Sequence, residues 1–252
     1  MRSLSFEWRP IIAMILFIIC WEVAVRAFQI KEWFLPAPSA IFKEARDVLP
    51  TFMPHFNASL SLAIFGFIIG VSIGLLIAMA LHVIPGVRRT IFPFIILSQN
   101  VPVIVLAPLL VIWFGFGFLP KLIIIVIACF FPVAISTLGG LQETDRELMH
   151  YMKMMGATNR QLLWKLQFPH ALPSIFSGLK IAATYSVMAT IISEWLGAQE
   201  GIGVYMTLAL SSYRTTRVFV AIIIAMLLSL AFFGAILLLE KWFIRGHKEE
   251  QS

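Results

Sequence analysis

Four polar side chains interrupt apolar stretches of the sequence and could contact a solute. Ser98, Gln99 and Asn100 stand together within one apolar run, and Glu194 stands near the end of another. A carboxylate within a run of membrane-spanning length is costly and usually faces protein or a water-filled cavity. We therefore predict that these four residues line the path of a polar solute. The alternatives are hydrogen bonds between helices and, for Glu194, a structural contact with a nearby donor or exposure at the membrane interface beside Trp195.

The sequence lacks the side-chain sets that perform common catalytic reactions. No Gly-Lys dipeptide occurs, so the chain has no Walker A loop to bind nucleotide phosphates. His150 and His170 have no carboxylate cluster beside them for a metal site, and Cys20 and Cys129 lie far apart within apolar runs. An intramembrane enzyme would need a nucleophile and a base at workable spacing. We therefore predict a non-enzymatic chain that binds no cofactor or metal ion itself.

The composition is that of a membrane protein. Of the 252 residues, 60% are hydrophobic and 13% are charged, and the mean hydropathy is +0.92. The net charge of +6 forms no basic stripe, because the lysines and arginines lie at the edges of apolar runs, so we expect no nucleic-acid partner. A helix needs roughly 20 apolar residues to cross a bilayer. We predict one all-α domain over residues 1–252 with six membrane spans, namely Pro10–Phe28, Leu60–Val83, Ile91–Phe114, Lys121–Leu138, Ile175–Leu196 and Val218–Phe243.

Several segments carry signals beyond hydrophobicity. A cleaved signal peptide is the alternative for the first run, but no small-x-small cleavage site follows it. A separate amphipathic helix is expected from Ser39 to Val48, and an outer loop over residues 197–217. The third span should be broken, because Pro102 and Pro108 interrupt its hydrogen-bond ladder. In the second span, small residues at every fourth position predict close approach of another helix; they are Gly66, Gly70, Gly74 and Ala78.

One long polar and basic segment, Glu143 to Pro173, separates the fourth and fifth spans. Leu148, Met152 and Met155 recur on one helical face, and Gly156 then allows a left-handed turn. Thr158 is a candidate N-cap, with Gln161 as its capping-box partner and Leu162, Leu163 and Leu166 on the apolar side of a second helix that Pro169 should end. The pattern predicts a helix, a tight turn and a second helix.

The basic residues predict the orientation of the spans. Cytoplasmic loops retain more lysine and arginine than translocated loops. With both chain ends and the segment 143–173 inside, the inner segments hold 12 of the 19 lysines and arginines and the outer segments hold 7. We therefore expect this segment and both termini in the cytoplasm.

The segment 143–173 resembles the conserved loop of permeases of binding-protein-dependent ABC importers, whose pattern is Glu-Ala-Ala, three residues, Gly, nine residues and Ile-x-Leu-Pro. Gly156 and Pro169 match, Leu166 and Phe168 take the apolar positions, and His150-Tyr151-Met152 replaces the Glu-Ala-Ala triplet. In that family the loop is the coupling helix, which docks on an ATPase subunit. By this resemblance the ATPase-coupling residues are expected to be Met152, Met155, Gly156, Ala157, Thr158, Gln161, Leu162 and Pro169. An ordinary cytoplasmic helical hairpin is the alternative.

Other motifs resemble the branch of this family that serves sulfonate, nitrate and thiamine-precursor importers. They include Leu35-Pro36-x-Pro38-Ser39 and Ser193-Glu194-Trp195-Leu196-Gly197-Ala198, while Gln99-Asn100-x-Pro102 and Ser177-Gly178-Leu179-Lys180-Ile181 are most similar to aminopyrimidine permeases. The resemblance implies a bacterial inner-membrane importer with two permease copies, two ATPase subunits that bind ATP, and an external solute-binding protein. A sulfonate, taurine or nitrate importer and an ion-coupled secondary transporter remain the alternatives.

Overall fold

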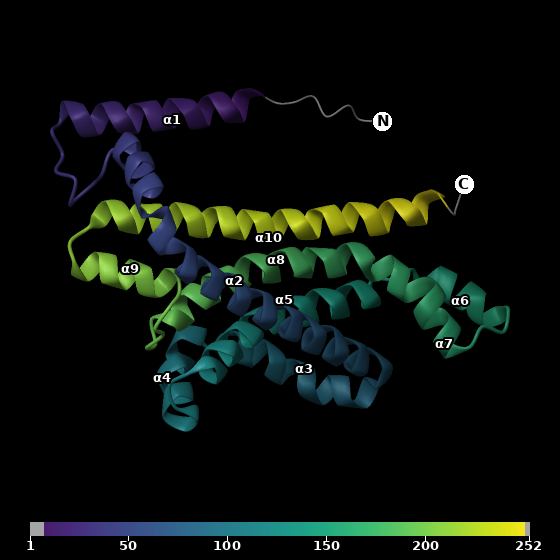
Figure 1. The fold of residues 1–252 in the computed structure, drawn as a ribbon. Coiled ribbons are helices and arrows are strands. Elements are labelled where there is room, and N and C mark those ends of the chain that lie inside the picture. The colour runs from purple at the N-terminus through teal and green to yellow at the C-terminus, as the bar shows by residue number, and fades with distance from the viewer. Residues whose placement is uncertain (1–7, 250–252) are drawn as a thin grey trace.

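The computed structural model describes residues 8–249 and consists there of helices joined by short connections (Figure 1). Five helices are long and apolar enough to cross a membrane: α1 (Trp8–Ala27), α2 (Pro38–Val83), α5 (Phe118–Gln142), the helical run Asn159–Glu194, and α10 (Thr215–Glu249). Two further apolar helices, α3 (Pro85–Gln99) and α4 (Val103–Phe114), meet at 97° and make a sixth span when they are counted as one broken span. The expected break near Pro102 is therefore confirmed, and so is the all-α membrane fold. The expected break at Pro108 is wrong, because this proline lies inside α4, which continues through it to Phe114.

The run Asn159–Glu194 is made of three helical pieces. It begins with α7 (Asn159–Leu162), continues through a π-helical turn, η1 (Leu163–Gln167), and ends with α8 (Phe168–Glu194). Two shorter helices complete the described chain: α6 (Arg146–Met154) precedes this run, and α9 (Ile202–Ser211) follows it. Figure 1 shows α6 and α7 at one end of the helical bundle and α9 at the opposite end, where α2 begins and α8 ends.

The centre of the bundle is the contact of α2 with α5 and of α5 with α8. Gly66, Gly70, Gly74 and Ala78 are all buried, which confirms the predicted small-residue face. A Cβ atom added to Gly70 would lie 2.9 Å from the Val126 carbonyl oxygen of α5, and one on Gly74 would lie 2.9 Å from the Phe130 carbonyl oxygen. The backbones of α2 and α5 can approach this closely only because the glycines carry no side chain.

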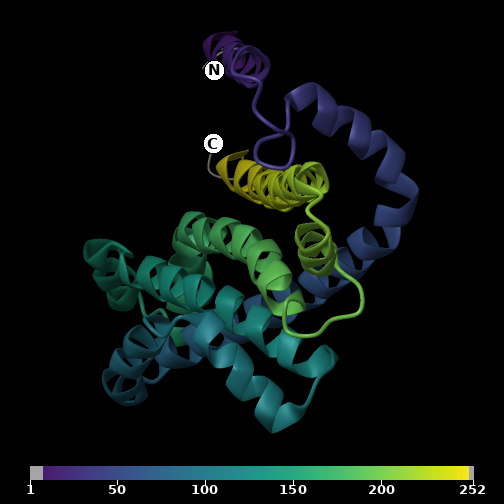
Figure 2. The same cartoon turned by 90° about the vertical axis from the view of Figure 1, so that its left-hand side faces the viewer.

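The expectation of a separate amphipathic helix before the second span is wrong. The two segments form one helix of 46 residues, with Pro50 and Pro54 inside it. Both prolines lie on the exposed side, where carbonyl groups freed by proline meet solvent, whereas Val48 and Phe52 on the other side are buried. Packing of the buried side therefore keeps the helix continuous through a curved N-terminal half, visible in Figure 2.

Two other boundaries differ from the sequence expectations. Pro169 does not end a helix, because the π-helical turn before it widens the backbone: the Phe168 amide donates to the Leu163 carbonyl, five residues back. Pro169 therefore lies in the first turn of α8, inside the continuous helical run. The segment 197–217, expected to be a loop, contains the helix α9. This helix is apolar but too short to cross a membrane, so the sequence did not indicate it as a span.

Candidate functional site: an exposed helical turn and a cavity at the broken span

The exposed turn between α6 and α7 is built by local sequence. Asp145 caps α6, since its carboxylate accepts a hydrogen bond of 2.7 Å from the Glu147 amide. Gly156 has a φ of +82°, as the left-handed turn requires, and the Ala157 amide donates to the Met152 carbonyl at 3.0 Å. The Asp145 bond therefore starts α6, and the Gly156 turn with the Ala157 bond ends it and reverses the chain.

The predicted capping box at the start of α7 is present. The Gln161 amide donates to Thr158 Oγ1 at 3.3 Å, and the Thr158 amide donates to Gln161 Oε1 at 2.8 Å. This pair fixes the direction in which α7 leaves the turn. The geometry of the turn is therefore encoded by residues 156–161.

The turn presents apolar side chains to solvent. Met154 and Met155 are 75% and 73% exposed, and Leu148 and Tyr151 of α6 are also exposed. Because this segment is expected to lie outside the membrane, its exposed apolar side chains suit contact with another protein. Among the residues predicted to couple to an ATPase, Met155, Gly156, Thr158 and Gln161 are exposed, Met152, Ala157 and Pro169 are partly buried, and Leu162 is buried. Leu162 therefore packs in the interior and anchors α7 to the rest of the bundle.

Sequence reasoning missed the side chains that brace this hairpin against α2. His82 Nε2 lies 3.0 Å from Gln167 Oε1, and Gln167 Nε2 donates to Met149 Sδ at 3.4 Å. Gln167 belongs to the π-helical turn, so one side chain joins the end of α2, the start of the long run and α6. No local pattern links residues so distant in sequence, which is why the sequence alone gave no signal for this contact.

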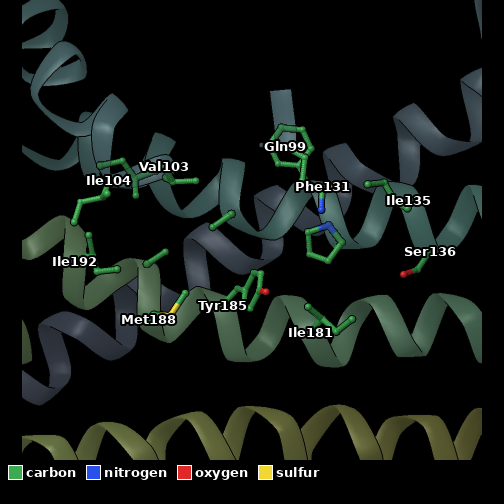
Figure 3. A pocket seen from close by; sticks show the side chains of 14 residues that line it. Gln99, Val103, Ile104, Phe131, Ile135, Ser136, Ile181, Tyr185, Met188 and Ile192 are labelled. Atoms are coloured by element: carbon green, nitrogen blue, oxygen red, sulfur yellow. The ribbon is translucent and has the colours of Figure 1, made fainter. Parts of the chain in front are cut away.

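The broken span forms one wall of a cavity of about 520 Å³. Its remaining walls come from α5 and α8, and Figure 3 shows Gln99 and Phe131 on one side with Tyr185 and Ile181 on the other. The lining residues are mostly apolar or aromatic and none of them is charged: Gln99, Val103, Ile104, Ile124, Ala128, Phe131, Pro132, Ile135, Ser136, Ile181, Tyr185, Met188, Ala189 and Ile192. A cavity with this lining suits a small, uncharged molecule that has a few polar groups.

The predicted solute-path residues do not all meet in this cavity. Gln99 lines it, whereas Ser98 Oγ donates to the Ile95 carbonyl at 2.9 Å and Asn100 Nδ2 donates to the Ile96 carbonyl at 2.8 Å, so both bond to carbonyl groups of α3. Glu194 borders a different cavity of about 460 Å³, together with Lys121 and residues 197–200. Phe131, Tyr185 and Met188 were missed because aromatic and methionine side chains in a membrane helix look like ordinary packing residues.

Glu194 is almost completely buried, with 2% of its surface exposed. Its Oε1 atom accepts a hydrogen bond of 2.5 Å from Ser59 Oγ, and its Oε2 atom accepts one of 2.7 Å from the Gly203 amide. The carboxylate thus joins α2, α8 and α9. This arrangement corresponds to the structural alternative considered for Glu194, and its place in a solute path stays a prediction.

Most of the chain is similar to known transport proteins of the membrane. Residues 70–245 match the model of the family described as "Binding-protein-dependent transport system inner membrane component". The chain is 32% identical, over 96% of both chains, to the formylaminopyrimidine transport permease protein ThiX of Halalkalibacterium halodurans. It is 30% identical to the taurine transport system permease protein TauC of Escherichia coli, over 82% of this chain and 77% of that protein.

A solved structure shares the fold. The crystal structure of an amino acid ABC transporter with histidines aligns with a TM-score of 0.63 and 21% identity, over 81% of this chain and 97% of the other. The helical order described above is therefore found in a known transporter structure.

Proposed function

We infer that this chain, which belongs to the family of inner membrane components of binding-protein-dependent transport systems, forms the membrane path of an importer for a small aminopyrimidine. It is an ABC transporter permease subunit, and the proposal concerns its cargo, direction and assembly. The observation that carries the cargo proposal is the uncharged cavity at the broken span, with Gln99, Phe131 and Tyr185 in its walls. The similarity to the formylaminopyrimidine permease over nearly the whole of both chains supports it.

The cavity chemistry distinguishes an aminopyrimidine from a sulfonate. A sulfonate binds best to arginine or to several amide donors, and none of the residues lining the cavity is a cation. An aminopyrimidine is flat and largely uncharged, so Tyr185 and Phe131 can pack on its faces while the Gln99 amide bonds to its ring nitrogen and amino group. We therefore propose an aminopyrimidine in preference to taurine or another sulfonate.

The proposed assembly contains two copies of this permease, two ATPase subunits and an extracytoplasmic solute-binding protein in the inner membrane. The exposed turn at Gly156 would dock on the ATPase, which binds and hydrolyses ATP. Closure of the ATPase dimer would then move α6 and the long helical run, and the solute path would change the side to which it opens. ATP drives this change only if it binds the two conformations with different affinity.

Reconstitution tests this proposal. The permease is placed in proteoliposomes with its ATPase subunits and binding protein, and uptake of a radiolabelled aminopyrimidine is compared with uptake of taurine. We expect ATP-dependent uptake of the aminopyrimidine only. Uptake by the permease alone without ATPase subunits would instead indicate a secondary transporter, and preferential uptake of taurine would contradict the proposed cargo.

A substitution in the cavity tests where the solute binds. Tyr185→Leu removes the ring from the cavity wall, and we expect KM for the aminopyrimidine to rise about tenfold, as the loss of one aromatic contact predicts. Tyr185→Phe is the matched control, since it retains the ring and should keep KM within about twofold of the parent. Equal KM values for the two variants would contradict solute binding at this wall.

A further inference from the structure

Three amides at the N-terminus of α9 donate to side chains from other helices. The Gly201 amide donates to His55 Nδ1 at 3.1 Å, the Ile202 amide donates to Ser59 Oγ at 2.8 Å, and the Gly203 amide donates to Glu194 Oε2 at 2.7 Å. A helix usually satisfies its first amides with a side chain just before it in sequence, but the residue at that position here is a glycine. The start of α9 is therefore held by tertiary contacts from α2 and α8.

Ser59 and Glu194 act as one unit in this contact. Ser59 Oγ donates to Glu194 Oε1 and accepts from the Ile202 amide, and the two residues are only 1% and 2% exposed. A carboxylate is favoured at a helix N-terminus, where the unpaired amides carry partial positive charge. Since both carboxylate oxygens accept from protein donors, Glu194 links α9 to α8 directly.

Gly201, which precedes α9, and Gly203 within it are required for this contact. Gly201 has a φ of +140°, and a Cβ atom added there would lie 2.5 Å from both Glu194 carboxylate oxygens. A Cβ atom on Gly203 would lie 3.1 Å from the Glu194 Cβ atom. The backbone at the start of α9 is therefore shaped to lie directly on the Glu194 side chain.

Glu194 is also the last residue of the helical run that begins at the exposed turn. The helical run Asn159–Glu194 has 36 residues, begins three residues after Gly156 and crosses the whole bundle (Figure 1). At a rise of 1.5 Å per residue such a run is about 54 Å long. A displacement at its α7 end is carried through one continuous backbone to the residue that holds α9.

We propose that Glu194 is a positioning residue that makes α9 move together with α8, so that the outer end of the permease follows the nucleotide state of the ATPase. The inference rests on the proposed function. Its consequence is that the cavity beside Glu194, Lys121 and residues 197–200 opens and closes as α9 moves. Ser59 contributes by hydrogen-bonding both the Glu194 carboxylate and the Ile202 amide, which holds the two groups in position.

The first measurement is how strongly the binding protein stimulates ATP hydrolysis in the assembled transporter. The complex of permease, ATPase subunits and binding protein is reconstituted, and ATP hydrolysis is measured with and without loaded binding protein. Glu194→Gln and Ser59→Ala should each reduce the stimulation by binding protein about tenfold, the effect expected from loss of one charge-assisted hydrogen bond. The controls are Ser72→Ala, whose hydroxyl bonds within its own helix, and Glu32→Gln, an exposed carboxylate; both should retain stimulation.

The second measurement separates transmission of motion from simple stability. Spin labels are attached in a chain with Cys20 and Cys129 replaced by alanine, at Thr207→Cys and Leu119→Cys near the α9 end. A second pair, His170→Cys and Val83→Cys, reports on the opposite end. In the parent, trapping with ATP and vanadate should change both distances.

In Glu194→Gln, the His170–Val83 distance should still change on trapping, whereas the Thr207–Leu119 distance should not. If the Thr207–Leu119 distance in this variant still changes on trapping, the inference is overturned. It is also overturned if the variant has a lower melting temperature but keeps both the stimulation of ATP hydrolysis by binding protein and the change in this distance. Ser59→Ala provides the same readouts if Glu194→Gln does not assemble. Failure of the parent complex to hydrolyse ATP in response to binding protein would contradict the proposed function rather than the role of Glu194.

Discussion

Gly156 is the residue on which the proposed docking turn depends. Its backbone has a φ of +82°, and a Cβ atom there would meet no atom within 4 Å. Aspartate is among the few residues that tolerate this left-handed conformation, so Gly156→Asp should fold and insert normally. The new carboxylate would project from the exposed turn, and we expect uptake in the reconstituted complex to be abolished.

Gly86→Asp is the matched control for this prediction. Gly86 also has no atom within 4 Å of an added Cβ, and it lies in the first turn of α3, where an aspartate is favoured. Uptake by Gly86→Asp should stay within about twofold of the parent because a surface substitution of this type changes stability by only about 0.5 kcal/mol. Retained uptake by Gly156→Asp at normal expression would argue against docking at the turn.

At the scale of elements, the contact of α2 with α5 is set by backbone proximity. Valine at Gly70 would place its Cβ 2.7 Å from Cys129 Cβ and 2.9 Å from the Val126 carbonyl oxygen, so the two helices would have to separate. We expect Gly70→Val to lower the free energy of unfolding in detergent by about 1–3 kcal/mol. A Cβ atom added to Gly234 on α10 would meet no atom within 4 Å, so Gly234→Val should have little effect. Equal stability of the two variants would contradict a close-packed interface.

The attachment of α10 to α8 includes an ion pair within the bundle. Lys180 Nζ lies 2.9 Å from Glu240 Oε2, and the two side chains are 21% and 18% exposed. Lys180→Met leaves the carboxylate without its cation, and we expect it to lower the unfolding free energy by about 1–3 kcal/mol. Adding Glu240→Met removes the unpaired charge and should recover most of this loss. A double variant no more stable than Lys180→Met would show that the pair has no coupling energy.

At the scale of the whole molecule, the α6–α7 turn and α9 lie at opposite ends of the long helices (Figure 1). The distribution of lysine and arginine predicts that the turn faces the cytoplasm. In a chain without native cysteines, a membrane-impermeant maleimide added to intact cells should label Ser212→Cys, next to α9, but not Met154→Cys. After the cells are broken open, both should react. Labelling of Met154→Cys in intact cells would reverse the orientation and remove the proposed ATPase contact.

The sequence by itself determined the features that depend on local chemistry. The length of each apolar run predicted the spans because a bilayer requires about 20 apolar residues for a crossing helix. Gly156, Thr158 and Gln161 predicted the turn because a left-handed residue and a capping box need particular side chains at fixed spacing. The glycines of α2 predicted a close helix contact, although not that α5 would be the partner.

Only the tertiary structure decided what depends on residues distant in sequence. The packing of Phe52 and Val48 keeps α2 continuous through two prolines, and the π-helical turn carries the chain past Pro169. The cavity exists because α3, α4, α5 and α8 surround one space. The sequence placed a carboxylate at residue 194 in a membrane helix, but only the fold brings Ser59 and Gly203 to its two oxygens, because hydrogen bonds between separate helices follow from how those helices pack.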